Sequence, residues 1–218
     1  MPVVPASVSK ALRTFSVLDN RILVKDEACQ QTKETDLMAK FFDSITPKLQ
    51  EFIEAQHMFF VATADTDGRI NLSPKGYDCM RVLGPNRIVW LNLSGSGNET
   101  AAHLRAVNRM TLMFCAMAGV PLILRMYGTA KTIHPRDEAW EPLYEHFGDF
   151  SGARQIFDVQ IDSLQTSCGF GVPLYEFVGD RSKLIEHSDA KGRATIEKGW
   201  LEKNAVSIDG LDTGIAET

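Results

Sequence analysis

Arg87-Ile-Val-Trp-Leu-Asn-Leu93 runs directly into Ser94-Gly-Ser-Gly-Asn-Glu-Thr100. The first of these stretches is apolar and predicts a strand, and the alanine-rich continuation over 99–108 predicts a helix. A glycine-rich turn that opens a helix offers free backbone N–H groups and the positive end of the helix dipole to an anion. Small hydroxyl and amide side chains in the turn add further donors. The sequence therefore predicts either a phosphate site or an ordinary Ser/Asn-capped helix after a turn.

The loop at 94–100 matches neither of the two common phosphate fingerprints. A Walker loop requires Gly-Lys followed by Ser or Thr, and the chain has no such tripeptide. A dinucleotide-binding turn requires a third glycine where Thr100 stands, within a βαβ unit. Because strands rather than helices precede the loop, a phosphate site here belongs to a mostly β scaffold.

The pattern on either side of the loop predicts a mainly β fold with peripheral helices. Helices are expected at 36–56, 99–108 and 135–147. Alternating apolar residues bounded by turn residues predict the strands, which are 58–64, 69–73, 77–83, 87–93, 110–117, 121–133 and 156–164. Six or more mainly antiparallel strands favour a closed barrel, because closure removes exposed sheet edges.

Composition predicts a cytoplasmic protein with one main domain. The chain has 218 residues, of which 44% are hydrophobic, and no apolar run reaches the roughly 18 residues of a membrane span. Its four cysteines are scattered without a CxxC pair, as expected of reduced thiols rather than a disulfide framework or a metal site. Residues 1–36 are expected to form an extension, either a hairpin over 13–25 or a loosely ordered segment, before a domain at 37–218.

Charge is unevenly divided along the chain. Between Gly68 and Lys131 there are eight basic and two acidic residues, a local net charge of +6 in a chain whose net charge is −5. A globally acidic protein is not expected to bind a nucleic-acid backbone. A basic region around a glycine-rich loop favours one compact anion, such as a cofactor phosphate. The alternative is a solvated barrel face.

A second motif, Ser73-Pro-Lys-Gly76, is expected to form a loop after the strand at 69–73. Lys75 can donate a charge-assisted hydrogen bond, worth roughly 1.5–3 kcal/mol, to a phosphate or a flavin ring. The alternative is a hairpin turn with an exposed lysine. Arg125 is the charged residue of an apolar strand, and it either points outward or meets an anion. Trp90 and Tyr127 are expected in the core.

The sequence contains no standard catalytic set, so catalytic residues are not assigned. The five histidines lack metal-ligand spacing. His103, one turn into the helix after the loop, either faces the ligand or lies on the helix surface, and the second position is favoured. Neither a Gly-x-Ser-x-Gly elbow nor an HExxH motif occurs. A phosphate site without a protein nucleophile suggests that a cofactor does the chemistry. Flavin is the natural candidate because it performs hydride transfer itself.

Several blocks together carry a family resemblance. In order they are Phe60-Val-Ala-Thr-Ala64 with Asp67-Gly68, Ser73-Pro-Lys-Gly76, Gly95-Ser-Gly-Asn-Glu-Thr-Ala-Ala-His103 and Leu124-Arg-Met-Tyr-Gly128. This series resembles the pyridoxamine 5′-phosphate oxidase-related family of FMN-binding split β-barrels. Thr166-Ser-Cys-Gly-Phe-Gly-Val-Pro173 and Ser207-Ile-Asp-Gly-Leu211 resemble a subgroup with extra C-terminal blocks.

The resemblance implies an FMN-dependent oxidoreductase that forms a homodimer, with FMN at the subunit interface and a small organic substrate. A deazaflavin in place of FMN is a variant of the same hypothesis. The domain at 37–218 is then a split-barrel flavin-binding domain with C-terminal helical and loop elements. The cofactor-binding residues implied are Ser73, Pro74, Lys75, Gly76, Ser94, Gly95, Ser96, Gly97, Asn98, Thr100 and Arg125.

The chain departs from the family at its acidic end. Pyridoxamine 5′-phosphate oxidases end in a basic, tryptophan-containing segment that binds the substrate phosphate, whereas this chain ends in Asp209-Gly-Leu-Asp-Thr-Gly-Ile-Ala-Glu-Thr218. Two alternatives to the favoured oxidoreductase therefore stay open. One is a genuine pyridoxamine 5′-phosphate oxidase, and the other is a non-enzymatic flavin- or haem-binding module.

Overall fold

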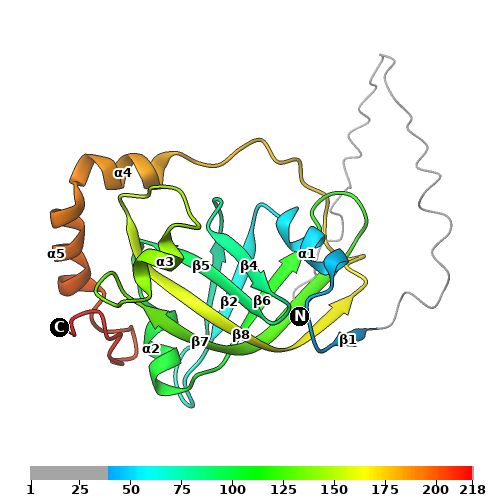
Figure 1. The fold of residues 1–218 in the computed structure, drawn as a ribbon, viewed down its shortest axis with the longest axis horizontal. Helices are drawn as coiled ribbons and strands as arrows, with labels where there is room; N and C mark the ends of the chain where they lie inside the picture. Colours follow the sequence, from blue (N-terminus) through cyan, green and yellow to red (C-terminus); the bar gives the residue numbers. More distant parts are fainter. Residues whose placement is uncertain (1–38, 218) are drawn as a thin grey trace, which may run out of the picture. The chain divides into compact units, whose positions relative to one another are not determined.

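A sheet of antiparallel strands forms the body of the computed structural model, which describes residues 39–217 (Figure 1). The predictions for 1–36, including the hairpin at 13–25, lie outside these residues. The strands are β1 (Lys40–Phe42), β2 (Phe59–Thr63), β3 (Asn71–Lys75), β4 (Met80–Gly84), β5 (Arg87–Leu93), β6 (Met110–Cys115), β7 (Ile123–Ile133) and β8 (Ala153–Ser167). The helices are α1 (Pro47–Glu54), α2 (Glu99–Ala106), α3 (Trp140–Tyr144), α4 (Lys183–Lys191) and α5 (Arg193–Lys203).

The sheet follows the order β3-β2-β6-β7-β8-β5-β4, with β1 added to β8. Every pairing is antiparallel, and the long strands β7 and β8 run side by side through the middle. Within the described chain, β3 and β4 end the path without pairing to each other, so the barrel is split along that line. The predicted fold class, a mainly β split barrel with peripheral helices, is confirmed.

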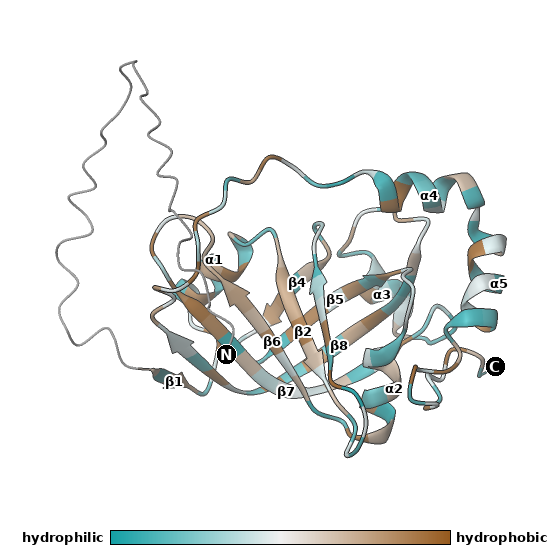
Figure 2. Ribbon diagram, turned by 180° about the vertical axis from the view of Figure 1, so that it is seen from behind, coloured by the Kyte–Doolittle hydropathy of each residue, from teal (hydrophilic) through white to brown (hydrophobic). Residues whose placement is uncertain are grey.

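The barrel interior is built from strand residues that alternate between two faces. In β2 the side chains of Phe59, Val61 and Thr63 are buried while their neighbours are half-buried, as the period of two requires. Trp90 stacks on Phe157 with ring centroids 4.4 Å apart, which confirms Trp90 as a core aromatic. Figure 2 shows hydrophobic residues along β2, β4 and β6, whereas α4 is largely hydrophilic.

The predicted helix at 36–56 is wrong over its first half. Residues 40–42 form β1, and α1 begins only at Pro47, where Leu49 N donates to Thr46 Oγ1 over 3.3 Å. A residue before proline is disfavoured in the helical region, whereas proline suits the first helical position. The Thr46-Pro47 pair therefore begins the helix rather than lying inside it.

Other boundaries also differ from prediction, among them that of the strand expected at 77–83, which is β4. The helix expected at 135–147 is reduced to the five residues of α3, because a turn closed by His134 N donating to Asp137 Oδ2 precedes it. Strand β8 is longer than the predicted 156–164. Strand β3 runs from Asn71 to Lys75 instead of 69–73, so Ser73 and Lys75 lie within a strand and not on a loop.

The chain after β8 wraps back over the barrel. Residues 168–182 form neither helix nor strand and cross above the sheet to α4, as the orange segment of Figure 1 shows. Helix α5 follows and packs on α4, and the turn after α5 lies against α2, where Arg105 pairs with Asp212 and Glu217. Among residues 39–217, no helix has the length and apolarity needed to cross a membrane.

Candidate functional site

The glycine-rich loop leads into α2 as predicted, but the junction is not an ordinary capped helix. Asn98 stands at the N-cap position and makes no side-chain capping bond. Its side chain is 3% exposed, and neither its amide nitrogen nor its amide oxygen has a partner. A buried amide without partners is costly in a folded protein. The Asn98 amide lies at the N-terminus of α2, where the first backbone N–H groups of the helix have no partner within the helix.

The carbonyl groups of the loop are held from one side. Asn204 Nδ2 donates to the Ser96 carbonyl over 3.2 Å, and Arg154 Nη2 donates to the Gly97 carbonyl over 3.0 Å. The peptide bonds of the described chain are trans, and a trans peptide points its N–H opposite to its C=O. The N–H groups of Gly97 and Asn98 therefore point away from Asn204 and Arg154.

Strand β3 faces this junction with its inner row of side chains, Asn71, Ser73 and Lys75. Asn71 Nδ2 donates to Thr100 Oγ1 over 3.2 Å in the first turn of α2. At the other end of the row, Lys75 Nζ donates to Asn92 Oδ1 over 3.4 Å. The Oγ of Ser73, between them, is buried without a partner. The structure thus brings the two sequence motifs to one place in the barrel.

Two cations, the half-buried Lys75 and the buried Arg154, give this place its electrostatic character. Burial and the nearby charge of Arg154 lower the pKa of Lys75 to about 8. Burial lowers the pKa of Arg154, whose side chain is 3% exposed, to about 10. Of the ion pairs between described residues, none includes either cation. Buried charges are usually paired, so these two favour a bound anion.

The predicted site residues do not all lie together. Arg125 is in register with Met113, Met113 with Phe60, and Phe60 with Pro74. Directly paired residues share a face, so Arg125 and Pro74 lie on the outer face of the sheet, away from Lys75. Arg125 Nη1 donates there to Ser167 Oγ over 3.2 Å.

The other predicted positions frame the loop. Ser94 Oγ donates to the Gly152 carbonyl over 3.0 Å and accepts from Trp200 Nε1 over 2.8 Å. Gly95 is exposed, with open space where a Cβ would stand. The Gly76 carbonyl, after β3, accepts from Cys79 Sγ over 3.0 Å.

Two other residues differ from prediction. His103 is buried instead of lying on the helix surface, because α2 packs on β2 and places His103 Nδ1 3.1 Å from Thr63 Oγ1. Tyr127 is not in the core. It lies on the outer face, where its hydroxyl donates to Gln165 Oε1 over 3.0 Å.

Sequence reasoning missed four polar residues around the loop, namely Asn92, Arg154, Gln155 and Asn204. Gln155 is fully buried, accepts from Asn92 Nδ2 over 3.4 Å and keeps its own Nε2 unpartnered. One signal was available, because Arg154-Gln155 interrupts the apolar start of β8. No feature of the sequence around Asn204 indicates that it belongs to the site. No cluster of three or more metal-ligating side chains occurs within residues 39–217.

Comparison with known proteins places the chain in a family. The model of the pyridoxamine 5′-phosphate oxidase N-terminal domain matches residues 45–168. The pyridoxamine 5′-phosphate oxidase family protein ustO of Aspergillus flavus is 37% identical over 192 residues, which cover 80% of this chain and 77% of that protein. The chain belongs to the pyridoxamine 5′-phosphate oxidase family.

Solved structures with a related fold are more distant. A candidate pyridoxamine 5′-phosphate oxidase of Lactobacillus delbrueckii is 17% identical with a TM-score of 0.45, over 56% of this chain and 94% of that one. An FMN-binding protein of Syntrophomonas wolfei is 13% identical with a TM-score of 0.40, over 53% and 80% of the two chains.

Proposed function

We propose that this member of the pyridoxamine 5′-phosphate oxidase family binds FMN and transfers hydride to or from a small organic substrate. The observation that carries the proposal is a half-buried cation, Lys75, and a buried one, Arg154, neither of which has a carboxylate partner among the described residues. They lie beside a helix N-terminus whose Asn98 amide is buried and unsatisfied. A phosphate would supply the missing charge and hydrogen-bond acceptors together.

The residues of the chain would hold and orient the cofactor. FMN supplies the hydride chemistry when bound. The N–H groups of Gly97 and Asn98 and the hydroxyl of Thr100 would bind phosphate oxygens. Lys75 and Ser73 would donate from the inner face of β3 to the phosphate or to an acceptor on the ring. Arg154 would contribute charge while it holds the loop through the Gly97 carbonyl. The buried donors that lack partners thus fit an anionic cofactor.

We also propose a homodimer through the outer face of the sheet. That face carries large apolar side chains in solvent, since Leu72 is 64% exposed and Phe41 71% exposed. Apolar sheet surface of this kind is usually covered by a partner. Arg125 lies on the same face, so a dimer with FMN near the interface would bring it toward the cofactor. A cytoplasmic location is part of the proposal and agrees with the free thiols of Cys79, Cys115 and Cys168.

The test is the absorbance spectrum of the purified protein, with mass analysis of the compound released on denaturation. Flavin bands and release of FMN support the proposal, whereas a haem Soret band or a released deazaflavin would contradict it. Protein purified without pigment is titrated with FMN and with riboflavin. Binding of FMN at least tenfold tighter than riboflavin is expected, and equal affinity would overturn the phosphate site.

Turnover separates the enzymatic alternatives. Bleaching of bound flavin by a nicotinamide, followed by reoxidation with an organic acceptor, is expected of the oxidoreductase. Formation of pyridoxal 5′-phosphate and hydrogen peroxide from pyridoxamine 5′-phosphate would instead identify a genuine pyridoxamine 5′-phosphate oxidase. Bound pigment without turnover would identify a binding module.

A further inference from the structure

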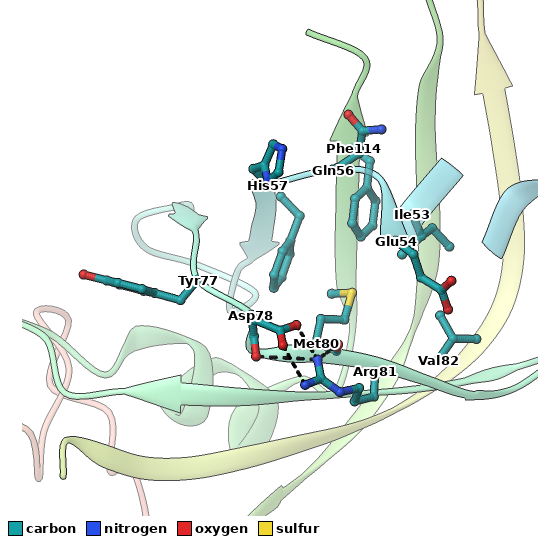
Figure 3. Close-up of a pocket in the computed structure, with 11 residues that line it drawn as sticks. Ile53, Glu54, Gln56, His57, Tyr77, Asp78, Met80, Arg81, Val82 and Phe114 are labelled. Carbon is teal, nitrogen blue, oxygen red and sulfur yellow. Dashed lines mark hydrogen bonds and ion pairs between the residues drawn. The ribbon is translucent and has the colours of Figure 1, made fainter. Parts of the chain in front are cut away.

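A cleft of about 290 Å³ opens into the barrel between β2, β4 and the end of α1 (Figure 3). Its apolar lining consists of Ile53, Phe59, Met80, Val82 and Phe114. In Figure 3 the side chains of Met80 and Phe114 stand within the cleft, and the Asp78–Arg81 pair lies across one side of it. The volume is near the lower limit for small-molecule sites.

The cleft adjoins the proposed flavin site through one pair of neighbours. Phe59 on β2 lines the cleft and is in direct register with Lys75 on β3. Side chains of directly paired residues lie on the same face about 5 Å apart at their Cβ atoms. Phe59 in the apolar wall of the cleft and Lys75 of the proposed flavin site are therefore direct neighbours, with no strand between them.

The Arg81 and Gln56 side chains in the lining are already hydrogen-bonded within the protein. Arg81 makes two hydrogen bonds to the carboxylate of Asp78, over 2.6 and 2.9 Å, and its Nε donates to the His146 carbonyl over 2.9 Å. Gln56 Nε2 donates to the Phe52 carbonyl over 2.9 Å. With Arg81 engaged by Asp78, and Glu54 a second carboxylate in the lining, the cleft disfavours phosphate and carboxylate ligands.

Aromatic side chains form the entrance. The His57 ring stacks on Phe177 of the segment 168–182, with centroids 3.6 Å apart and planes 7° from parallel. Tyr77 has a φ of 62°, which is rare for a bulky residue, and its hydroxyl donates to the Arg181 carbonyl over 2.6 Å. Both contacts hold the crossing segment beside the cleft. Strain of this kind persists where the surrounding structure enforces it, often at ligand sites.

We propose that the cleft binds an uncharged, ring-containing organic molecule, and that it is the substrate pocket beside the flavin. The identification as a substrate pocket rests on the proposed function, whereas the binding itself does not. An apolar floor of two phenyl rings and a methionine favours a flat aromatic molecule. The absence of an available cation in the lining argues against a phosphorylated substrate such as pyridoxamine 5′-phosphate.

The experiment uses 1,4-naphthoquinone as the probe and calorimetry as the measurement, on protein with and without FMN. We expect micromolar to submillimolar binding in both forms. Val82→Phe, which fills the cleft, should weaken this binding at least tenfold and leave FMN affinity unchanged. Val120→Phe is the matched control, because Val120 is exposed and does not line the cleft. Phe177→Ala, at a half-exposed position where folding is not at risk, should weaken probe binding several-fold.

The outcomes separate the two proposals. FMN binding without naphthoquinone binding, or probe binding that Val82→Phe leaves unchanged, would overturn the cleft assignment alone. Competition between FMN and naphthoquinone would also overturn it, because the cleft would then be part of the flavin site. Naphthoquinone binding in a protein that binds no FMN would support the cleft and refute the proposed flavin function.

Discussion

Arg154 Nη1 donates to Asn204 Oδ1 over 2.9 Å, and both residues also hold carbonyl groups of the glycine-rich loop. The bond joins the start of β8 to the end of α5, so the loop is fixed between the barrel and the C-terminal helix. Because Asn204 is neutral, it satisfies Arg154 without cancelling its charge. The positive charge of Arg154 therefore stays uncancelled on the carbonyl side of the loop, opposite the N–H groups of Gly97 and Asn98.

Replacing Asn204 should weaken cofactor binding without removing any group that touches the cofactor. For Asn204→Ala we expect FMN affinity to fall roughly 10- to 100-fold, because hydrogen bonds to charged groups are worth about 1.5–3 kcal/mol. Asn204→Asp should be at least as harmful, since a carboxylate would neutralise Arg154. The measurement is fluorescence titration with FMN and riboflavin. Lys203→Ala, at the exposed neighbouring position, is the control, and an equal loss of riboflavin affinity would contradict a phosphate-specific effect.

Removing hydrogen-bond donors from both sequence motifs should abolish FMN binding. The double variant Lys75→Ala and Thr100→Ala loses a half-buried cation from the end of β3 and a hydroxyl from the first turn of α2, and we expect it to lose FMN during purification. The flavin-to-protein ratio is read from absorbance. Lys131→Ala, on the exposed side of β7, should keep its cofactor. Full retention of FMN in the double variant would refute the site.

The pKa of Lys75 predicts two pH dependences of opposite sign. Burial lowers this pKa to about 8 in the folded protein, so between about pH 8 and the ordinary lysine value near 10.4 the unfolded chain binds more protons. The contribution of Lys75 to the free energy of unfolding of the FMN-free protein should therefore rise with pH across this window. FMN affinity should fall over the same window, because the cation is lost.

Lys75→Arg tests the assignment of both effects. An arginine keeps its charge through this range, so the fall in FMN affinity between pH 8 and 10 should flatten in the variant. Denaturation and FMN titrations at half-unit pH intervals measure the two trends. An unchanged pH profile in Lys75→Arg would show that another group is responsible.

One glycine in the barrel wall should tolerate no side chain. A Cβ at Gly128 would overlap the Gln160 carbonyl oxygen, at the bulge where β7 shifts register against β8. Gly128→Ala should destabilise the fold by about 3 kcal/mol or more, because the obstacle is backbone and cannot turn aside. Gly84→Ala is the matched control, since nothing lies within 4 Å of its Cβ position. Urea denaturation curves that coincide for the two variants would contradict this close approach.

The sequence predicted the parts of the site that are local in the chain. The strand–loop–helix unit at 87–108 follows from a run of apolar residues, a glycine-rich turn and an alanine-rich helix, and Lys75 follows from its motif. Arg125 shows the limit of such reasoning. Alternation along the strand indicates that the Arg125 side chain points to the other face of the sheet from those of Leu124 and Met126. Only the register of four strands shows that Arg125 and Lys75 lie on opposite faces.

Residues missed by sequence reasoning depend on tertiary contacts. Arg154 and Asn204 are ordinary surface residue types, and only Arg154, at the apolar start of β8, has a neighbouring sequence that indicates burial. Asn204 contacts the loop across 108 positions of sequence. The wrong assignment at 36–56 has a local cause, because the helical pattern was extended back across the Thr46-Pro47 boundary.

The long separation between the loop and Asn204 bears on how the protein acquires its cofactor. The strand–loop–helix unit is synthesised early, yet its Ser96 carbonyl and its Ser94 hydroxyl meet Asn204 and Trp200 only after α5 has been made and has docked. A nascent chain that ends before α5 would contain the proposed phosphate-binding residues in an unfixed loop. Cofactor loading would then be a late event in biogenesis, and partially synthesised or clipped chains would not compete with finished molecules for FMN.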